Sequence, residues 1–85
     1  MHTAELAFRY RSPEAAALVA EAVAGEIGEL DDERASTTLE RVGPEVRIGI
    51  EATDLVALRA GLNTWTTLLE VAERAAEAGR PGEIL

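Results

Sequence analysis

The sequence DLVALRAGLNTWTTLLEVAERAAEA, from Asp54 to Ala78, decides the fold of this 85-residue chain. Its apolar residues recur at alternating spacings of three and four, which predicts an amphipathic helix. Asp54, or Thr53 before it, can accept a hydrogen bond from a free amide of the first turn. Gly79, followed by Arg80-Pro81-Gly82, ends the helix. The periodic residues are Leu55, Leu58, Leu62, Trp65, Leu69, Ala72 and Ala76.

This helix carries more apolar surface than one sheet can cover. Steps of about 100° per residue leave a polar arc of roughly a third of the circumference, whereas a helix on one sheet needs an apolar stripe little over ~100° wide. Its length, on the order of 37 Å at ~1.5 Å per residue, exceeds the radius of gyration near ~12 Å expected for a compact chain of this size. We therefore expect one end to project and a partner protein to cover the spare surface. One apolar flank holds Leu55, Leu58, Leu62, Trp65 and Leu69, and the other holds Ala57, Ala60, Leu68, Val71, Ala75 and Ala78.

The first third of the chain predicts a strand and a second helix. Residues Ala4 to Tyr10 alternate between apolar and polar side chains, as a half-buried strand does. Ser12-Pro13-Glu14 then starts a helix that reaches about Gly25 or Ile27. Its alanines either allow another helix to approach closely or only raise helix propensity, and both interpretations stay open. The expected sheet-facing stripe of this helix is Leu18, Val19, Ala22, Val23 and Ile27.

The middle of the chain predicts two more strands. Gly28 to Arg34 is an acidic connector that lacks the ligand spacing of a calcium loop. Ser36 to Val42 and Glu45 to Ala52 read as strands joined at the turn pair Gly43-Pro44. Residues 1–85 thus form one α+β two-layer domain of order β-α-β-β-α, with two helices on one face of a three-stranded antiparallel sheet. The inward residues of the last strand are Val46, Ile48, Ile50 and Ala52, and small gaps at Ala7 and Gly49 interrupt the polar face.

The composition narrows the possible functions. Sixteen acidic residues stand against eight basic ones, all arginine, giving a net charge of -8. Such a chain repels phosphate backbones, which argues against free-standing nucleic-acid binding but not against a basic partner. The chain has no cysteine, no segment of the ~18 apolar residues that a membrane span needs, and no signal-peptide pattern at its start. We expect a cytoplasmic protein, and the acid-rich, lysine-free composition suggests adaptation to concentrated salt.

Catalytic residues are scarce. His2 lies at a terminus expected to fray, and no Cys, Lys or suitably placed Ser can form an activated nucleophile. Glu70, Glu73 and Glu77 share the polar helix face, where solvation is expected rather than acid-base chemistry. We therefore expect no enzyme activity, no cofactor and no metal. Arg59 and Asn63, four residues apart, could bond to each other, to a strand end or to a partner, and an exposed helical pair is the favoured interpretation.

Two segments of the sequence are distinctive. The first is Ala57 to Trp65, ALRAGLNTW, which follows the strand end IGIEA at Ile48 to Ala52 and the helix start at Asp54. The second is the opening, where Phe8-Arg9-Tyr10 precedes Ser12-Pro13-Glu14-Ala15 and an alanine-rich helix. Both resemble a known family, the small dimerisation subunit of the KEOPS complex (Pcc type). The likeness spans roughly Ala4 to Ala76, and its most specific part is the Leu-Arg-Ala-x-Leu-Asn segment.

The resemblance implies a fold, partners and a pathway. It implies a KH-like fold and a homodimer, from an archaeal, salt-adapted source, that docks both helices on the catalytic subunit of KEOPS. That complex makes the threonylcarbamoyl modification of adenosine 37 in tRNAs reading codons that begin with A, so tRNA would be contacted only indirectly. The chain lacks the Gly-x-x-Gly loop of RNA-binding KH domains. By this analogy the apolar residues divide between core and docking surface, and Arg59 and Asn63 match the family motif. The candidate partner-binding residues are Leu18, Ala22, Arg59, Leu62, Asn63, Trp65 and Leu69.

Two other functions stay open at this point. The first is a small dimeric ligand-sensing regulatory domain of the split βαβ type, which would normally end with a fourth strand after the second helix. Glu83-Ile84-Leu85 is short for such a strand. The second is a stand-alone helical dimer that joins no larger complex. Co-purification with the catalytic subunit of KEOPS separates the scaffold hypothesis from both.

Overall fold

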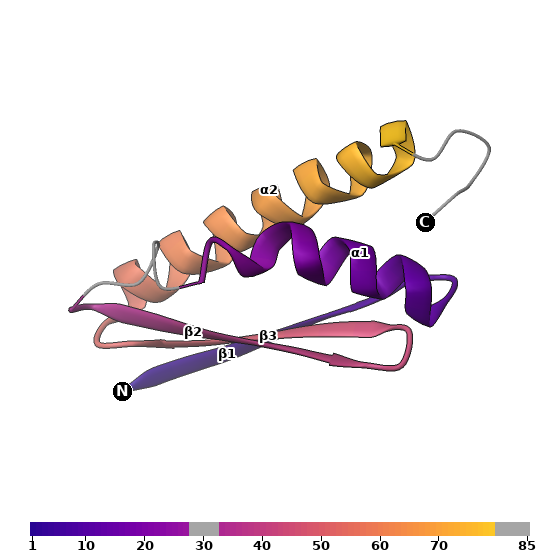
Figure 1. Ribbon diagram of the computed structural model, residues 1–85. Helices are drawn as coiled ribbons and strands as arrows, with labels where there is room; N and C mark the ends of the chain where they lie inside the picture. Colours follow the sequence, from indigo (N-terminus) through magenta and orange to yellow (C-terminus); the bar gives the residue numbers. More distant parts are fainter. Residues whose placement is uncertain (28–32, 80–85) are drawn as a thin grey trace.

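The chain folds into two layers, a sheet and a pair of helices on one of its faces (Figure 1). The computed structural model describes residues 1–27 and 33–79, without the side chains of 77–79. The predicted order β-α-β-β-α and the α+β class are confirmed. The elements are β1 (His2–Arg9), α1 (Pro13–Ala24), β2 (Ala35–Val42), β3 (Glu45–Ala52) and α2 (Leu55–Gly79).

The sheet has the strand order β1-β3-β2, and both pairings are antiparallel. Ile50 of β3 lies opposite Ala4 of β1 and Thr37 of β2. Gly43 closes the hairpin between β2 and β3 with a φ of 60°, a left-handed conformation that suits glycine, so the predicted turn is confirmed. Strands β1 and β2 are left as the two edges.

The core lies between β3 and the helices. Val46, Ile48 and Ile50 are at most 1% exposed, as the alternation of this strand predicts. The inward residues of the edge strands, such as Leu6 and Phe8, are only half-buried and pack against this core from the side. The helices therefore cover the middle of the sheet better than its edges.

Helix α1 begins as the sequence predicts, but its buried stripe differs. The backbone N–H of Ala15 donates to the Ser12 hydroxyl at 3.1 Å, and Pro13 takes the first helical position. Ala22, expected to face the sheet, is exposed, and Leu18 is half-buried outside the core cluster. These two expectations are wrong because the small residues on the neighbouring side of the helix fit closer to the strands. The buried residues of α1 are Ala15, Ala16, Val19 and Val23.

Helix α2 lies nearest the sheet at its start and rises away from it toward its C-terminal end (Figure 1). Trp65, Leu69 and Ala72 are its core residues, each at most 5% exposed. Gly61 allows a close approach, since a Cβ there would lie 3.3 Å from Cγ2 of Ile50. The molecule extends 42 × 21 × 17 Å, in agreement with the expected projecting helix.

The structure tests the expectation for the start of the chain but not the one for its end. His2 is not frayed but lies in β1, opposite Ala52, because β3 is long enough to pair with it. The acidic connector at 28–32 and the segment Arg80-Pro81-Gly82, with the expected loose tail to Leu85, lie outside the described residues. Residues 1–27 and 33–79 contain three strands, so the fourth strand of a split βαβ regulatory domain is not found among them.

Candidate partner-binding surface

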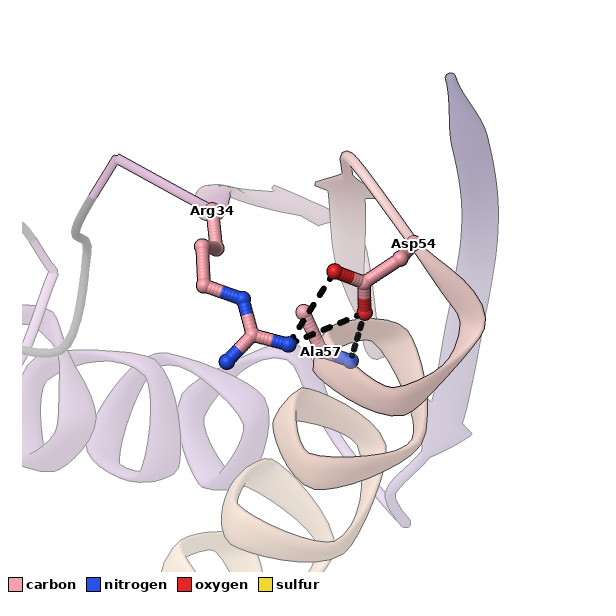
Figure 2. A network of polar contacts seen from close by, with 3 residues as sticks. All are labelled: Arg34, Asp54 and Ala57. Atoms are coloured by element: carbon pink, nitrogen blue, oxygen red, sulfur yellow. Dashed lines mark hydrogen bonds and ion pairs between the residues drawn. The ribbon is translucent and has the colours of Figure 1, made fainter.

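The start of α2 is fixed to the start of β2 by one carboxylate, shown in Figure 2. Asp54 Oδ1 accepts the backbone N–H of Ala57 at 2.8 Å, which confirms Asp54 as the helix cap. The Arg34 guanidinium Nη2 donates to both oxygens of Asp54, at 3.1 and 3.0 Å. The Ala57 amide and the Arg34 guanidinium together hold the pKa of Asp54 below its ordinary value.

Two further hydrogen bonds set the rotation of α2 about its axis. The Trp65 indole Nε1–H donates to Thr37 Oγ1 of β2 at 3.2 Å. Farther along, the Tyr10 hydroxyl donates to Glu73 Oε2 at 2.6 Å, and this partly buried bond joins the end of β1 to the rising part of the helix. Burial, and then this bond, raise the pKa of Tyr10. With both bonds in place, the outward side of α2 is defined.

That outward side carries a stripe of small and apolar residues, which we call the outer flank. It consists of exposed residues that fall within an arc of about 80° when successive residues are set ~100° apart. Val71 in this stripe is 55% exposed, and Val56, in the first turn of the helix just beside the same arc, is 71% exposed. No charged side chain belongs to this stripe. The members of the outer flank are Ala60, Thr64, Thr67, Val71 and Ala75.

The outer flank borders two shallow hollows. One, of about 160 Å³, lies between α2 and the start of β2, with Ala60 and Thr64 on its helical side and Arg34 on the other. The second is lined by Asn63, Thr64, Thr67 and Leu68. Near them, the hydroxyls of Thr66 and Thr67 donate to the carbonyl oxygens of Leu62 and Asn63, at 2.8 and 3.0 Å. A side chain of a partner could enter either hollow.

The seven predicted partner-binding residues divide into three groups. Trp65 and Leu69 are each 1% exposed and belong to the core, so they offer almost no surface to a partner. Leu18 and Leu62 are half-buried, and Leu62 packs against the core. The exposed group is Ala22, Arg59 and Asn63.

Arg59 and Asn63 are both available to a partner. Within residues 1–27 and 33–79, neither side chain takes part in a hydrogen bond or ion pair, so the suggested bond between them is not formed. Asn63 lines the second hollow. Thr64 and Thr67, which complete the outer flank, were not singled out from the sequence. Their positions four and seven residues after Ala60 were the signal that could have found them.

The polar groups do not suggest catalysis. In the described part of the chain, no three His, Cys, Asp or Glu side chains lie close enough together to hold a metal ion. Glu73, one of the carboxylates of the polar helix face, is engaged by Tyr10. Among the described helices, none is long and apolar enough to cross a membrane.

The opposite face of the sheet is polar and hollowed at its centre. Gly49 lacks a side chain there, which confirms the predicted gap, and a hollow of about 360 Å³ lies over it between Thr3, Glu5 and Thr38. Arg47 on the same face donates to the Glu45 carboxylate. This face is exposed along both edge strands.

Comparison with known proteins gives a family and similar solved structures. A family model described as Transcription factor Pcc1 matches residues 3–77. A chain in the crystal structure of the binary complex Gon7-Pcc1 aligns with a TM-score of 0.77 and 17% identity, over 91% of this chain and 94% of that chain. At this identity the match supports the fold alone. No curated protein matches the sequence.

Proposed function

The chain belongs to the Pcc1 family, and on this premise we propose that it is a noncatalytic scaffold subunit of the KEOPS complex. In this role it forms a homodimer and docks its helices on the catalytic subunit. It thereby supports threonylcarbamoyl modification of adenosine 37 in tRNAs that read codons beginning with A. The match to a Gon7-Pcc1 complex supports the fold on which this proposal rests.

The outer flank of α2 is the observation that carries the proposal. Val71 on this flank and Val56 beside it leave more than half of their surface in water, although the sheet side of the same helix is closely packed. Such exposure is unfavourable by about 25 cal/mol per Å² of apolar area, and a protein partner removes it. Small residues such as Ala60 and Ala75 let a second helix approach closely along the flank.

Charge and chemistry are in keeping with a scaffold. The net charge of -8 opposes direct contact with DNA or RNA phosphates, so any role near tRNA is indirect. A noncatalytic role is in keeping with the described acidic side chains of α2, because Glu73 accepts the Tyr10 hydroxyl and Glu70 is exposed to solvent. The catalytic subunit then supplies ATP chemistry and any metal.

Co-purification with the catalytic subunit tests the proposal. Ala60→Arg places a long charged side chain on the outer flank but keeps a good helix former, so the domain should fold and fail to co-elute. Thr38→Glu, exposed on the open sheet face, is the matched control and should co-elute like the wild type. Failure of the wild type to co-elute, or equal binding by all three proteins, would contradict docking through the outer flank.

A further inference from the structure

The hollow on the open face of the sheet has a glycine at its floor. Gly49 lies in the central strand, opposite Glu5 of β1 and Thr38 of β2. Apart from its chain neighbours, the described residues place one atom within 4 Å of a Cβ built on Gly49, the Thr38 Oγ1 at 2.7 Å. Glycine inside a strand weakens it and often marks a place where a ligand or another chain approaches closely. The hollow, of about 360 Å³, thus reaches down to the main chain.

The walls of this hollow offer hydrogen-bond acceptors. Five exposed polar side chains line it, and they are Thr3, Glu5, Ser36, Thr38 and Glu51. Within residues 1–27 and 33–79, none of the five takes part in a side-chain hydrogen bond or ion pair. Ionised carboxylates only accept hydrogen bonds, and hydroxyls can accept them as well. The hollow therefore suits a group that carries positive charge and donates several hydrogen bonds.

The nearest cation along β3 is turned away from the hollow. Arg47 Nε donates to the carboxylate of Glu45, which precedes it on the strand, whereas Gly49 follows it. None of the residues that line the hollow is basic. The negative charge of the hollow is therefore left for a group from outside the described chain to neutralise, and the net charge of -8 attracts a basic partner to it.

The two carboxylates are spaced for one planar cation. Glu5 lies opposite Gly49, and Thr3 lies opposite Glu51, so Glu5 and Glu51 are diagonal neighbours on adjacent strands. Diagonal neighbours on one face lie about 7–8 Å apart, within reach of long side chains. A guanidinium group has five N–H donors in a rigid planar fork and can bind a carboxylate on each side, whereas an ammonium group is a compact point charge.

We propose that the hollow over Gly49 receives an arginine side chain from a basic segment of a partner protein. The guanidinium bridges the carboxylates of Glu5 and Glu51, and the neighbouring hydroxyls accept its remaining N–H groups. This surface lies on the face of the sheet opposite the helices. The inference therefore goes beyond the proposed function, because a second protein can bind here while the outer flank of α2 holds the catalytic subunit.

Other occupants of the hollow fit its chemistry less well. Nucleic acid would bring phosphates toward Glu5 and Glu51, which is unfavourable. A metal ion would find two carboxylates here, and the described residues contain no group of three His, Cys, Asp or Glu side chains that could hold one. A guanidinium uses both the carboxylates and the hydroxyls.

A titration followed by NMR tests the site with a short peptide of defined sequence. The probe is acetyl-Gly-Ser-Gly-Arg-Gly-Arg-Gly-Ser-Gly-amide, and the matched control peptide has lysine at both arginine positions. We expect the largest shifts at the amides of Gly49, Thr38 and Glu51, and binding of the lysine peptide about threefold to tenfold weaker. Equal binding of the two peptides, or shifts centred on the helices, would overturn the proposal.

Paired variants separate the hollow from general charge attraction. Glu5→Gln combined with Glu51→Gln removes both carboxylates at nearly constant shape, and should raise the dissociation constant of the arginine peptide about tenfold. Glu21→Gln combined with Glu70→Gln removes the same charge from exposed positions on the helices and should bind nearly like the wild type. Circular dichroism checks that both are folded. Equal weakening in the two double variants would contradict a specific site. Such a result leaves the scaffold proposal standing, because co-elution through the outer flank tests that separately.

Discussion

Helix α2 has two apolar sides, and only one of them is needed for the fold. On the side toward the sheet, Trp65 and Leu69 are 1% exposed. On the outer flank, Val71 is 55% exposed, and small residues such as Ala60 surround it. The larger side chains lie inside because burial of apolar area stabilises the fold in proportion to that area. The apolar pattern therefore predicts where the helix is. The size of the apolar side chains distinguishes the side that packs in the core from the outer flank.

The largest expected contrast comes from the same substitution on the two sides. Leu69→Glu buries a carboxylate without a partner and should leave the chain largely unfolded. Val71→Glu, two residues away on the outer flank, should leave thermal stability nearly unchanged and reduce co-elution with the catalytic subunit. Thermal melts followed by circular dichroism measure the first effect. Equal loss of stability in both variants would mean that the outer flank belongs to the core.

Truncation to alanine gives a graded form of the same comparison. Trp65→Ala removes a buried ring and its bond to Thr37, and should lower the free energy of unfolding by about 3–5 kcal/mol. Val56→Ala, at a 71% exposed position, should change it by no more than about 0.5 kcal/mol. Urea unfolding measures both values. A loss above 1 kcal/mol for Val56→Ala would place that residue in a packed environment.

A smaller effect is expected where the helix leaves the sheet. Tyr10→Phe keeps the half-buried ring but removes the hydroxyl that donates to Glu73. The free energy of unfolding should fall by about 1 kcal/mol, because the bond is partly buried and its acceptor is charged. Urea unfolding provides the measurement, and Glu73→Gln, which keeps an acceptor, is the matched control. If Tyr10→Phe is as stable as the wild type, the bond does not hold the rising part of α2.

The smallest effect is a pH dependence at the start of α2. The folded pKa of Asp54 lies below its ordinary value of 3.8, so its stabilisation is fully present above that value. It is lost as the pH falls through the folded pKa. Asp54→Asn keeps a capping side chain without titrating, so the difference in stability between wild type and variant should shrink as the pH falls below 3.8 and vanish below the folded pKa. Urea midpoints across this range test it, and parallel curves would contradict the assignment.

Most of the fold followed from the sequence because its signals are local. Ser12 and Asp54 cap the two helices, and Gly43 turns the hairpin, as predicted. Which residues of α1 are buried was harder to predict, because its alanines are alike in size and polarity. Only the contact with the strands shows that Ala15 and Ala16 are inside and Ala22 is outside.

Less of the candidate site could be read from the sequence. Arg59 and Asn63 were correctly placed on the polar side of α2, but Trp65 and Leu69 were assigned to the partner because the sequence does not show how deep the sheet side lies. The bonds Tyr10–Glu73 and Trp65–Thr37 join residues 63 and 28 positions apart. No local pattern encodes such contacts, and they determine which flank of α2 faces outward.

Thr67 gives the outer flank fewer free hydrogen-bond donors than its composition suggests. Its hydroxyl donates to the Asn63 carbonyl oxygen one turn earlier, as the Thr66 hydroxyl does to Leu62 on another side of the helix. The donor of Thr67 is thus used inside the helix, and its methyl group and acceptor lone pairs remain at the surface. A partner therefore need not supply an acceptor for this hydroxyl, and valine in place of Thr67 should bind almost as well.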